Sequence, residues 1–238
     1  MGLRAQKEHF GKGFFGILAS SKDPNSAVKI EEELWRKGYH FVGGVDEAGR
    51  GALGGPLVAS CVVLPPFKSF SFLKDSKVLS PQKREKLFSF ICDHAISIGI
   101  GMACERLIDI LGINAANLYV FREAILRVVL PRPLEFLISD WLEVKGIPVP
   151  HLALPKAEQK SQSVAAASIV AKVFRDKLMQ GLYHSAFPKY RFREHKGYAT
   201  RIHTQIICEL GITKCHRQSF CKNHGTKSKR RLWGNNSQ

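Results

Sequence analysis

Residues 41–51 read Phe-Val-Gly-Gly-Val-Asp-Glu-Ala-Gly-Arg-Gly, and this is the most informative stretch of the chain. The apolar residues at its start predict a β-strand, and a second apolar run follows at residues 57–64. Two carboxylates, Asp46 and Glu47, end the first predicted strand, and a Gly-Arg-Gly turn comes directly after them. Carboxylates can hold Mg²⁺ or Mn²⁺, and glycines let backbone N–H groups approach a phosphate. The stretch therefore predicts a metal site beside a phosphate site, which an enzyme that cuts a phosphodiester needs.

The chain carries a large excess of positive charge. Among its 238 residues, 36 are lysine or arginine and 20 are aspartate or glutamate, which gives a formal net charge of +16. Such an excess favours a polyanionic partner, most often a nucleic acid, over a basic protein without one. Residues 222–238 contain only basic charges and predict a disordered tail, which either contacts phosphates non-specifically or only keeps this end of the chain in solution.

Hydrophobic patterning and cysteine content bear on where the protein works. No segment approaches the ~18 continuous apolar residues of a membrane span, and residues 14–19 are too short for a signal-peptide core. We therefore expect a cytoplasmic protein without a membrane partner. The six cysteines form no C-x₂-C pair, so we expect free thiols. The last three, Cys208, Cys215 and Cys221, lie near His203, His216 and His224, which leaves a structural zinc site open.

The order of the predicted elements indicates an α/β fold. Apolar runs predict strands, and helical periodicity or capping residues predict the helices between them. The strands are expected at residues 41–45, 57–64, 96–104, 134–140 and 151–155, and the helices at residues 26–37, 80–92, 114–129, 163–182 and 200–210. This order predicts a mixed five-stranded sheet flanked by helices on both faces.

Three carboxylates, Asp46, Asp140 and Glu158, each follow an apolar strand. Ligands bind at this edge of open α/β sheets, so these side chains and the neighbouring Glu47 are predicted to meet at one rim. Four anions packed together repel one another unless cations lie between them, and a two-metal site of the kind used in phosphoryl transfer resolves the conflict. Because successive side chains of a strand face opposite ways, Asp46 and Glu47 can share a metal only if the strand bends near Glu47.

Two other polar segments are candidate contacts for a phosphate or a sugar. Lys77, in the polar loop 74–77, is predicted either to contact a phosphate or to lie in a solvated turn. In residues 195–198, Lys196 could neutralise a phosphate and Tyr198 could stack on a sugar or base. The alternative for this segment is a turn with a half-buried tyrosine.

Several motifs together resemble the type 2 ribonuclease H family, also called ribonuclease HII. They lie at residues 44–51 (Gly-Val-Asp-Glu-Ala-Gly-Arg-Gly), 75–77 (Asp-Ser-Lys), 165–176 (Ala-Ala-Ala-Ser-Ile-Val-Ala-Lys-Val-Phe-Arg-Asp), 195–198 (His-Lys-Gly-Tyr) and 216–220 (His-Arg-Gln-Ser-Phe). They occur in the family's order and at family-like spacing across residues 40–222, and as a set they are highly specific.

The resemblance implies a ribonuclease H-like catalytic domain with a C-terminal helical part at residues 38–221, between an N-terminal extension (1–37) and the basic tail (222–238). It implies endonucleolytic cleavage of the RNA strand of RNA–DNA hybrids, and of single ribonucleotides embedded in duplex DNA, with Mn²⁺ or Mg²⁺ as cofactor. The expected products carry 5′-phosphate and 3′-hydroxyl ends. The resemblance also implies work in DNA replication and repair, as a monomer, with a replication clamp as a candidate partner.

The motifs also imply roles for single residues. They place Asp46, Glu47 and Asp140 on the family's metal-binding carboxylates, Gly49, Arg50 and Gly51 on its turn that senses the ribose 2′-hydroxyl, and Tyr198 on its junction-reading tyrosine.

Two positions depart from the family pattern. Glu158 stands where the family usually has an aspartate, which is expected to change metal preference or rate, and Trp141 stands where a glycine commonly follows Asp140. The bulky Trp141 is expected to alter the local backbone.

Two other functional classes are left open. A non-catalytic nucleic-acid-binding module would explain the charge but not the clustered carboxylates, and a Holliday-junction or transposase-type nuclease would share the fold.

Overall fold

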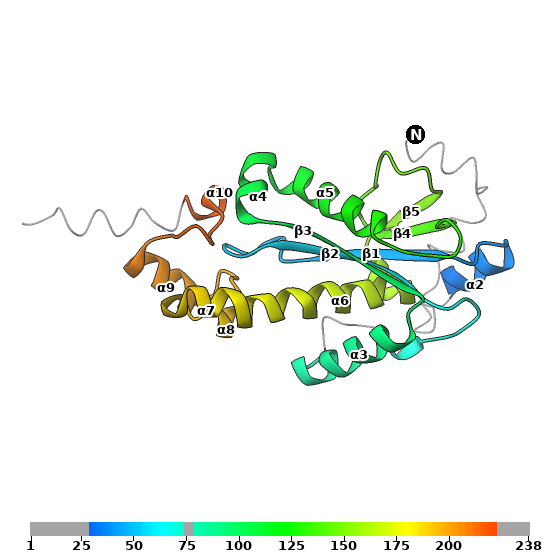
Figure 1. Ribbon diagram of the computed structural model, residues 1–238, viewed down its shortest axis with the longest axis horizontal. Helices are drawn as coiled ribbons and strands as arrows, with labels where there is room; N and C mark the ends of the chain where they lie inside the picture. The colour runs from blue at the N-terminus through cyan, green and yellow to red at the C-terminus, as the bar shows by residue number, and fades with distance from the viewer. Residues whose placement is uncertain (1–28, 74–78, 223–238) are drawn as a thin grey trace, which may run out of the picture.

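A computed structural model describes residues 29–73 and 79–222, and a mixed five-stranded sheet forms its centre (Figure 1). The strands, in the order β3-β2-β1-β4-β5 across the sheet, are β1 (Val42–Ala48), β2 (Leu57–Val63), β3 (Ser97–Ala103), β4 (Phe136–Asp140) and β5 (His151–Leu154). Strands β1, β2 and β3 pair antiparallel, whereas β4 pairs parallel with both β1 and β5. The predicted mixed sheet is therefore confirmed.

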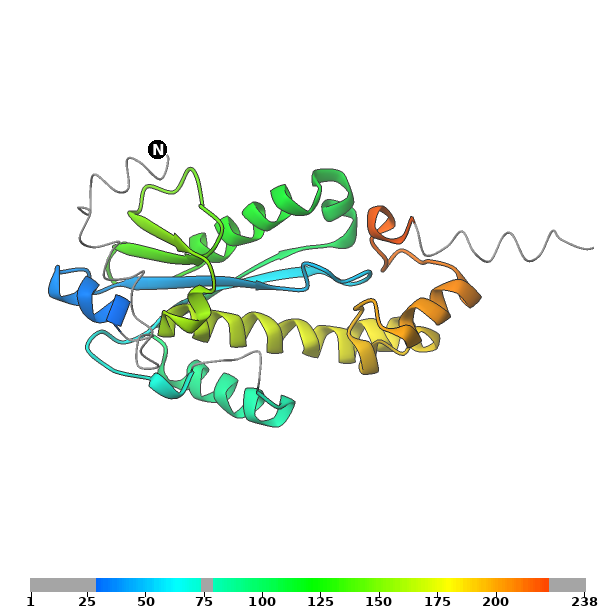
Figure 2. The same ribbon diagram turned by 180° about the vertical axis from the view of Figure 1, so that it is seen from behind.

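Helices cover both faces of this sheet, as the two opposite views show (Figures 1 and 2). Helix α5 (Ile113–Leu126), preceded by α4 (Glu105–Leu111), packs on one face, and α6 (Gln162–Leu178) packs on the other. The remaining elements are α2 (Lys29–Arg36), η2 (Ser71–Leu73), α3 (Pro81–His94), η3 (Ala157–Gln159), the π-turn η4 (Met179–Tyr183), α7 (His184–Ala186), η5 (Pro188–Tyr190), α8 (Phe192–His195), α9 (Arg201–Leu210) and α10 (Gln218–Cys221).

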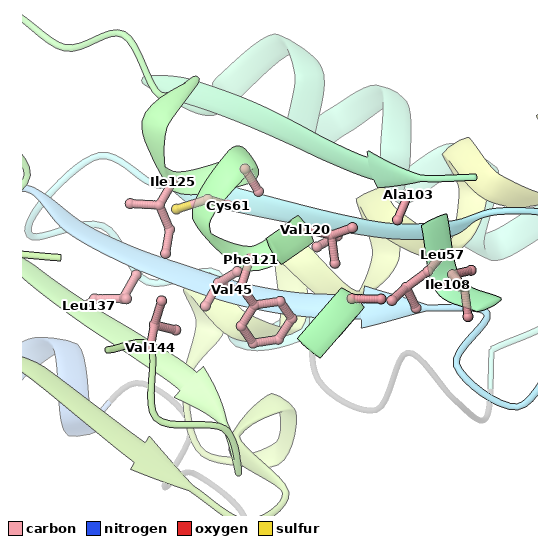
Figure 3. Packing of buried hydrophobic residues seen from close by; sticks show 13 residues of the cluster. Val45, Leu57, Cys61, Ala103, Ile108, Val120, Phe121, Ile125, Leu137 and Val144 are labelled. Atoms are coloured by element: carbon pink, nitrogen blue, oxygen red, sulfur yellow. The ribbon is translucent and has the colours of Figure 1, made fainter. Parts of the chain in front are cut away.

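The core between the sheet and α5 is built from alternate residues of the central strands. Figure 3 shows Val45 and Leu57 from adjacent strands facing Val120 and Phe121 of α5, and all four side chains have no exposed surface. Burying each of them contributes roughly 1.5–3 kcal/mol relative to leaving it in water. This layer fixes α5 against β1, the strand that carries the predicted carboxylates.

Helix α6 lies unusually close to the other face of β1. A methyl group at Gly44 would lie 2.1 Å from the backbone carbonyl carbon of Ser163, so only glycine permits this approach. The helix contributes a run of small buried residues, Ala165 to Ala167, to the contact. Small side chains on both elements therefore bring the α6 backbone to the strand, and the polar residues farther along α6 come within reach of Asp46.

The helix starts follow the local sequence closely. Ser80 accepts a hydrogen bond from the backbone N–H of Lys83 at 3.3 Å with Pro81 in the first turn, and Thr200 accepts one from His203 N–H, also at 3.3 Å. The helix predicted at residues 163–182 ends at Leu178 and continues as the π-turn η4.

One predicted strand end is wrong. Strand β1 runs to Ala48, because its antiparallel pairing with β2 continues to the Ala48–Val58 pair. Asp46 and Glu47 therefore lie inside the strand and not after it.

Helix α2 packs into the same body as the sheet. Ile30, Leu34 and Trp35 are buried in a cluster with Phe136 and Ile138 of β4. The division of the chain at residues 37 and 221 stays a prediction. None of the helices within residues 29–73 and 79–222 combines the length and apolar character that a bilayer crossing needs.

Candidate active site

Asp46 and Glu47 take neighbouring positions of β1 and face opposite sides of the sheet, as strand alternation predicts. Asp46 is 4% exposed, and the Ser168 hydroxyl of α6 donates a hydrogen bond to it. Glu47 faces α5, where the amide of Asn117 lies beside its carboxylate. The Glu47 backbone N–H also donates to Asp46 Oδ1 at 2.8 Å. Each helix therefore supplies one polar side chain to one carboxylate.

Asp140 joins this pair from the neighbouring parallel strand. It is the last residue of β4, directly after the Val45–Ser139 pair, and it raises the pKa of both Asp46 and Glu47. Its Oδ1 accepts a hydrogen bond from the Ala157 N–H of η3 at 3.1 Å. Glu158 follows Ala157 and is 2% exposed. The structure thus draws β1, β4 and η3 together: the carboxylates of Asp46, Glu47 and Asp140 act on one another at one end of the parallel strands, and Glu158 lies on the segment whose backbone contacts Asp140.

The electrostatics of the group show crowded, buried anions. The pKa of Asp46 lies well above its ordinary value because of burial and, after that, repulsion by Glu47 and Asp140. Burial also raises the pKa of Glu47, while the positive charge of Arg50 lowers it. Such a group is unfavourable by itself and becomes favourable with cations between the carboxylates.

The donor atoms fit hard divalent cations, which take oxygen ligands. The Asn117 amide lies beside the Glu47 carboxylate, but Glu47 Oε2 and both polar side-chain atoms of Asn117 are buried and form no hydrogen bond of normal geometry among the described residues, as expected of a cavity that receives a polar group. As the side chains stand, no three histidine, cysteine, aspartate or glutamate groups in the described part of the chain are already arranged as metal ligands. Metal ligation by the four carboxylates stays a prediction.

Side chains from distant segments surround the turn after β1. Gly49 has φ +93°, and a methyl group there would lie 2.0 Å from Arg175 Nε, so a larger residue is excluded on two grounds. At Gly51 a methyl group would meet nothing within 4 Å, which leaves that backbone open to a ligand. The Arg50 side chain lies between Asn114, whose Oδ1 accepts from Nη2 at 2.7 Å, and the ring of Trp141, 4.4 Å from the guanidinium carbon.

A groove of about 370 Å³ runs beside this turn. Its lining comes from β1, the turn, α3, α6 and the segment after α8, namely Glu47, Ala48, Gly49, Arg50, Gly51, Arg84, Ser168, Lys172 and Tyr198. A carboxylate and three cationic side chains therefore share one cavity, as a site for a metal ion beside a phosphate backbone requires.

Two buried arginines hold the turn: Arg175 joins it to the Tyr198 segment, and Arg217 joins it to the C-terminal segment. Arg175 has no exposed surface and donates to the carbonyl oxygens of Pro56 at 2.8 Å, Gly54 at 3.0 Å and Lys196 at 3.0 Å. Its guanidinium carbon lies 5.0 Å from the centre of the Tyr198 ring, and a methyl at Gly49 would strike its side chain. Arg217 is also fully buried, and donates to the carbonyl oxygens of Gly55 and Arg50.

Sequence reasoning gave neither arginine a role, because an arginine is rarely fully buried unless it is paired. Their signal was their position inside the motifs at residues 165–176 and 216–220. Lys172, in the first of these motifs, was also given no role, and its Nζ lies 4.8 Å from the centre of the Tyr198 ring. Asn117 carried no sequence signal.

The two predicted lysine contacts have different outcomes. Lys196 donates through Nζ to the carbonyl oxygens of Arg193 at 2.6 Å and Glu194 at 3.3 Å, so its side chain closes its own turn. Its contact with a phosphate stays a prediction. Lys77 lies outside the described residues.

Three histidines near Tyr198 form a buried array. The rings of His195 and His203 stack at 4.1 Å, and Nε2 of His203 lies 3.1 Å from Nε2 of His216. Burial lowers the pKa of both His203 and His216 to about 4, so both are neutral at pH 7. His203 Nδ1 lies 3.0 Å from the Tyr198 carbonyl oxygen. The six cysteines form no disulfides. The histidine array supports the Tyr198 backbone through the His203 contact and through ring packing, and a structural zinc site at these residues stays a hypothesis.

Comparison with known proteins identifies close relatives. The ribonuclease HII family matches residues 43–223 of the chain. A ribonuclease HII of Syntrophotalea carbinolica is 42% identical over 195 residues, which cover 82% of this chain and 92% of that protein. Among solved structures, ribonuclease H2 from Pyrococcus horikoshii OT3 has a TM-score of 0.64 and 27% identity, covering 82% of this chain and 99% of that one. RNase HII from Archaeoglobus fulgidus, solved in complex with PCNA, has a TM-score of 0.61 and 28% identity, covering 75% of this chain and 94% of that one.

These likenesses confirm the family suggested by the motifs and the ribonuclease H-like fold. The matched region runs from β1 through α10 and includes every element of the candidate site. The chain belongs to the ribonuclease HII family and is a metal-dependent ribonuclease H, which hydrolyses phosphodiester bonds in RNA–DNA hybrids.

Proposed function

We propose that the groove beside β1 cleaves the RNA strand of RNA–DNA hybrids, and single ribonucleotides embedded in duplex DNA, by a two-metal hydrolysis that leaves 5′-phosphate and 3′-hydroxyl ends. The observation that carries this proposal is the convergence of Asp46, Glu47 and Asp140 beside a cavity lined by cations. A groove that only bound a polyanion would gain nothing from buried carboxylates, because they repel phosphates.

The chain's own residues would hold the reacting groups in place. The Ser168 hydroxyl and the Ala157 N–H fix Asp46 and Asp140 through hydrogen bonds. Glu47 and Glu158 complete the proposed set of metal ligands. Mn²⁺ or Mg²⁺ bound there would supply an activated water and stabilise the leaving oxygen.

The substrate would be oriented by the turn and by the Tyr198 segment. Gly49 and Gly51 line the groove, and the open backbone at Gly51 suits a ribose 2′-hydroxyl, the group that distinguishes RNA from DNA. Arg84 and Lys172 would neutralise phosphates along the groove. The Tyr198 ring, held over Arg175 and Lys172, would pack on the sugar that follows a ribonucleotide.

The proposed function also implies where the enzyme works and with which partner. We infer a monomeric cytoplasmic enzyme that removes RNA from DNA during replication and repair. The relative from Archaeoglobus fulgidus solved with PCNA supports a replication clamp as the partner.

Cleavage of three duplexes tests the proposal: an RNA–DNA hybrid, a DNA duplex with one ribonucleotide, and the same duplex in DNA alone. With Mg²⁺ and Mn²⁺ in parallel, we expect cleavage of the first two and ligatable 5′-phosphate ends. Asp46→Asn should lower the rate about a hundredfold or more, because a bound metal ion contributes several kcal/mol to the transition state.

The Asp46→Asn variant should stay folded, because it removes a buried anion that is repelled by its neighbours. Asp93→Asn, on the exposed side of α3, is the matched control and should cleave normally. Near-normal cleavage by Asp46→Asn would refute the assigned role. Binding of the hybrid without any cleavage by the wild-type protein would favour a non-catalytic module instead.

A further inference from the structure

Trp141 occupies a backbone conformation that suits glycine. It follows Asp140 directly, its φ is +47°, and 45% of its surface is exposed. A bulky residue with such a φ is a steric outlier, and such outliers gather at functional sites.

The fold sets this conformation, and the indole does not. The Trp141 N–H donates to the Leu154 carbonyl oxygen of β5 at 2.9 Å, and the Ser139 hydroxyl donates to the Leu142 carbonyl oxygen at 2.6 Å. Both bonds would form equally with glycine at residue 141, which would adopt the same φ without strain. The presence of a tryptophan in this strained conformation must therefore be explained by the contacts of its side chain.

That side chain contacts Arg50. The indole lies 4.4 Å from the guanidinium carbon, a distance at which a cation is attracted to the ring face. On its other side Arg50 donates to Asn114 Oδ1 at 2.7 Å, and its carbonyl oxygen accepts from Arg217 Nη1 at 3.0 Å. Arg217 thus fixes the Arg50 backbone, while Trp141 and Asn114 fix the direction of its side chain.

The Arg50 side chain must be held in place because carboxylates lie close to it. The positive charge of Arg50 already acts on Glu47, three residues earlier in a crowded group of carboxylates. A flexible guanidinium in this place would pair with those carboxylates, since close opposite charges in a poorly solvated site attract strongly. It would then be lost to a phosphate or ribose in the groove.

We propose that Trp141 is a positioning residue for Arg50: its indole face holds the guanidinium at the groove, where it contacts the sugar-phosphate backbone of the nucleic acid. This inference rests on the proposed function, because it takes the groove to be the substrate site. It assigns the strain at residue 141 to substrate binding and not to the stability of the fold.

Binding of a fluorescent RNA–DNA hybrid, followed by anisotropy in EDTA so that no cleavage occurs, tests the proposal. Loss of one cation–π contact predicts about two- to tenfold weaker binding by Trp141→Ala. Trp141→Phe should bind nearly as the wild type, because phenylalanine also offers a ring face. In an Arg50→Ala background, Trp141→Ala should cause no further loss, because the residue that it positions is gone.

Trp141→Gly separates positioning from stability. It removes the strain and the indole together, so thermal unfolding should occur at the same or a higher temperature while hybrid binding weakens as in Trp141→Ala. Unchanged binding by both variants would overturn the proposal. An additive loss in the double variant would also overturn it, because Trp141 would then contact the nucleic acid by itself. If the wild type neither bound nor cleaved the hybrid, the proposed function would fall and this inference with it.

Discussion

Glu31 gives a prediction whose magnitude follows directly from its surroundings. It lies on α2 without exposed surface, and its Oε1 accepts hydrogen bonds from the Ser161 hydroxyl at 2.6 Å and the Ser163 N–H at 3.0 Å at the start of α6. Its Oε2 is buried and has no hydrogen-bond partner among the described residues. Burial raises the pKa of this carboxyl from 4.5 to about 7, against the smaller opposing effect of those hydrogen bonds.

The direction in which stability changes with pH follows from the pH at which Glu31 loses its proton in each state. In the folded protein Glu31 holds its proton up to about pH 7, whereas in the unfolded chain it releases the proton near pH 4.5. The folded state therefore loses stability as the pH rises from 4.5 through 7, and the loss is complete above the folded pKa. At about 1.4 kcal/mol per pKa unit, the full effect is roughly 3 kcal/mol, of which about 2–3 kcal/mol develops between pH 5 and pH 8.

Glu31→Gln removes this pH dependence. The amide oxygen can accept the same two hydrogen bonds, and the amide does not ionise. We expect the free energy of unfolding of the variant, relative to the wild type, to increase by about 2–3 kcal/mol from pH 5 to pH 8. Any cost of the buried amide N–H groups is the same at both pH values and cancels in this difference.

Urea denaturation followed by circular dichroism at pH 5, 6, 7 and 8 measures the effect. Glu32→Gln, an exposed position of the same helix, is the matched control and should follow the wild type at every pH. A difference between Glu31→Gln and the wild type that stayed constant from pH 5 to pH 8 would refute the reasoning, because the carboxylate would then not be desolvated in the folded protein.

Three further predictions concern the site and the tail. Tyr198→Ala should slow cleavage at a single embedded ribonucleotide roughly ten- to hundredfold and slow cleavage of a long hybrid less, because stacking on a sugar or base is worth about 1–3 kcal/mol. Tyr198→Phe should retain most of this activity, and equal losses by Tyr198→Ala on both substrates would argue against junction reading. Glu158→Asp should keep activity and shift preference towards Mg²⁺, which demands near-ideal octahedral geometry; loss with both metals would show that the backbone is adapted to the longer side chain. Deletion of residues 222–238 should flatten the dependence of log affinity on log salt, because fewer counterions are released, and an unchanged slope would assign the tail no phosphate contacts.

The sequence was most informative where structure is local. Apolar runs identified all five strands, and Ser80 with Pro81 identified the start of α3, because capping and periodicity are properties of neighbouring residues. The end of β1 was placed too early, because the pairing with β2 overrides the polar character of Asp46 and Glu47. Strand pairing is a contact between segments, which periodicity within one segment does not record.

Function followed from the sequence through combinations of motifs. No single acid among the predicted ligands was decisive, but the Asp46-Glu47 pair beside Gly49 and Gly51, with the later motifs in order, indicated one family. The sequence also marked Trp141 as unusual, without showing what its side chain contacts.

Residue types at fixed spacing were enough to identify the five strands, the longer helices and the family of the chain, whereas the short helices α4, α7, α8 and α10 were not predicted. Only the tertiary structure decided how the site is held together. Arg175 donates to carbonyl oxygens of the turn after β1 and of the Tyr198 segment, which lie far apart in the chain, and Arg217 donates to two carbonyl oxygens of the same turn. The two guanidinium groups satisfy these oxygens, just as the Trp141 ring and Asn114 hold Arg50. Such contacts arise where distant segments meet, because a buried polar group must find its partner in whatever the fold places beside it.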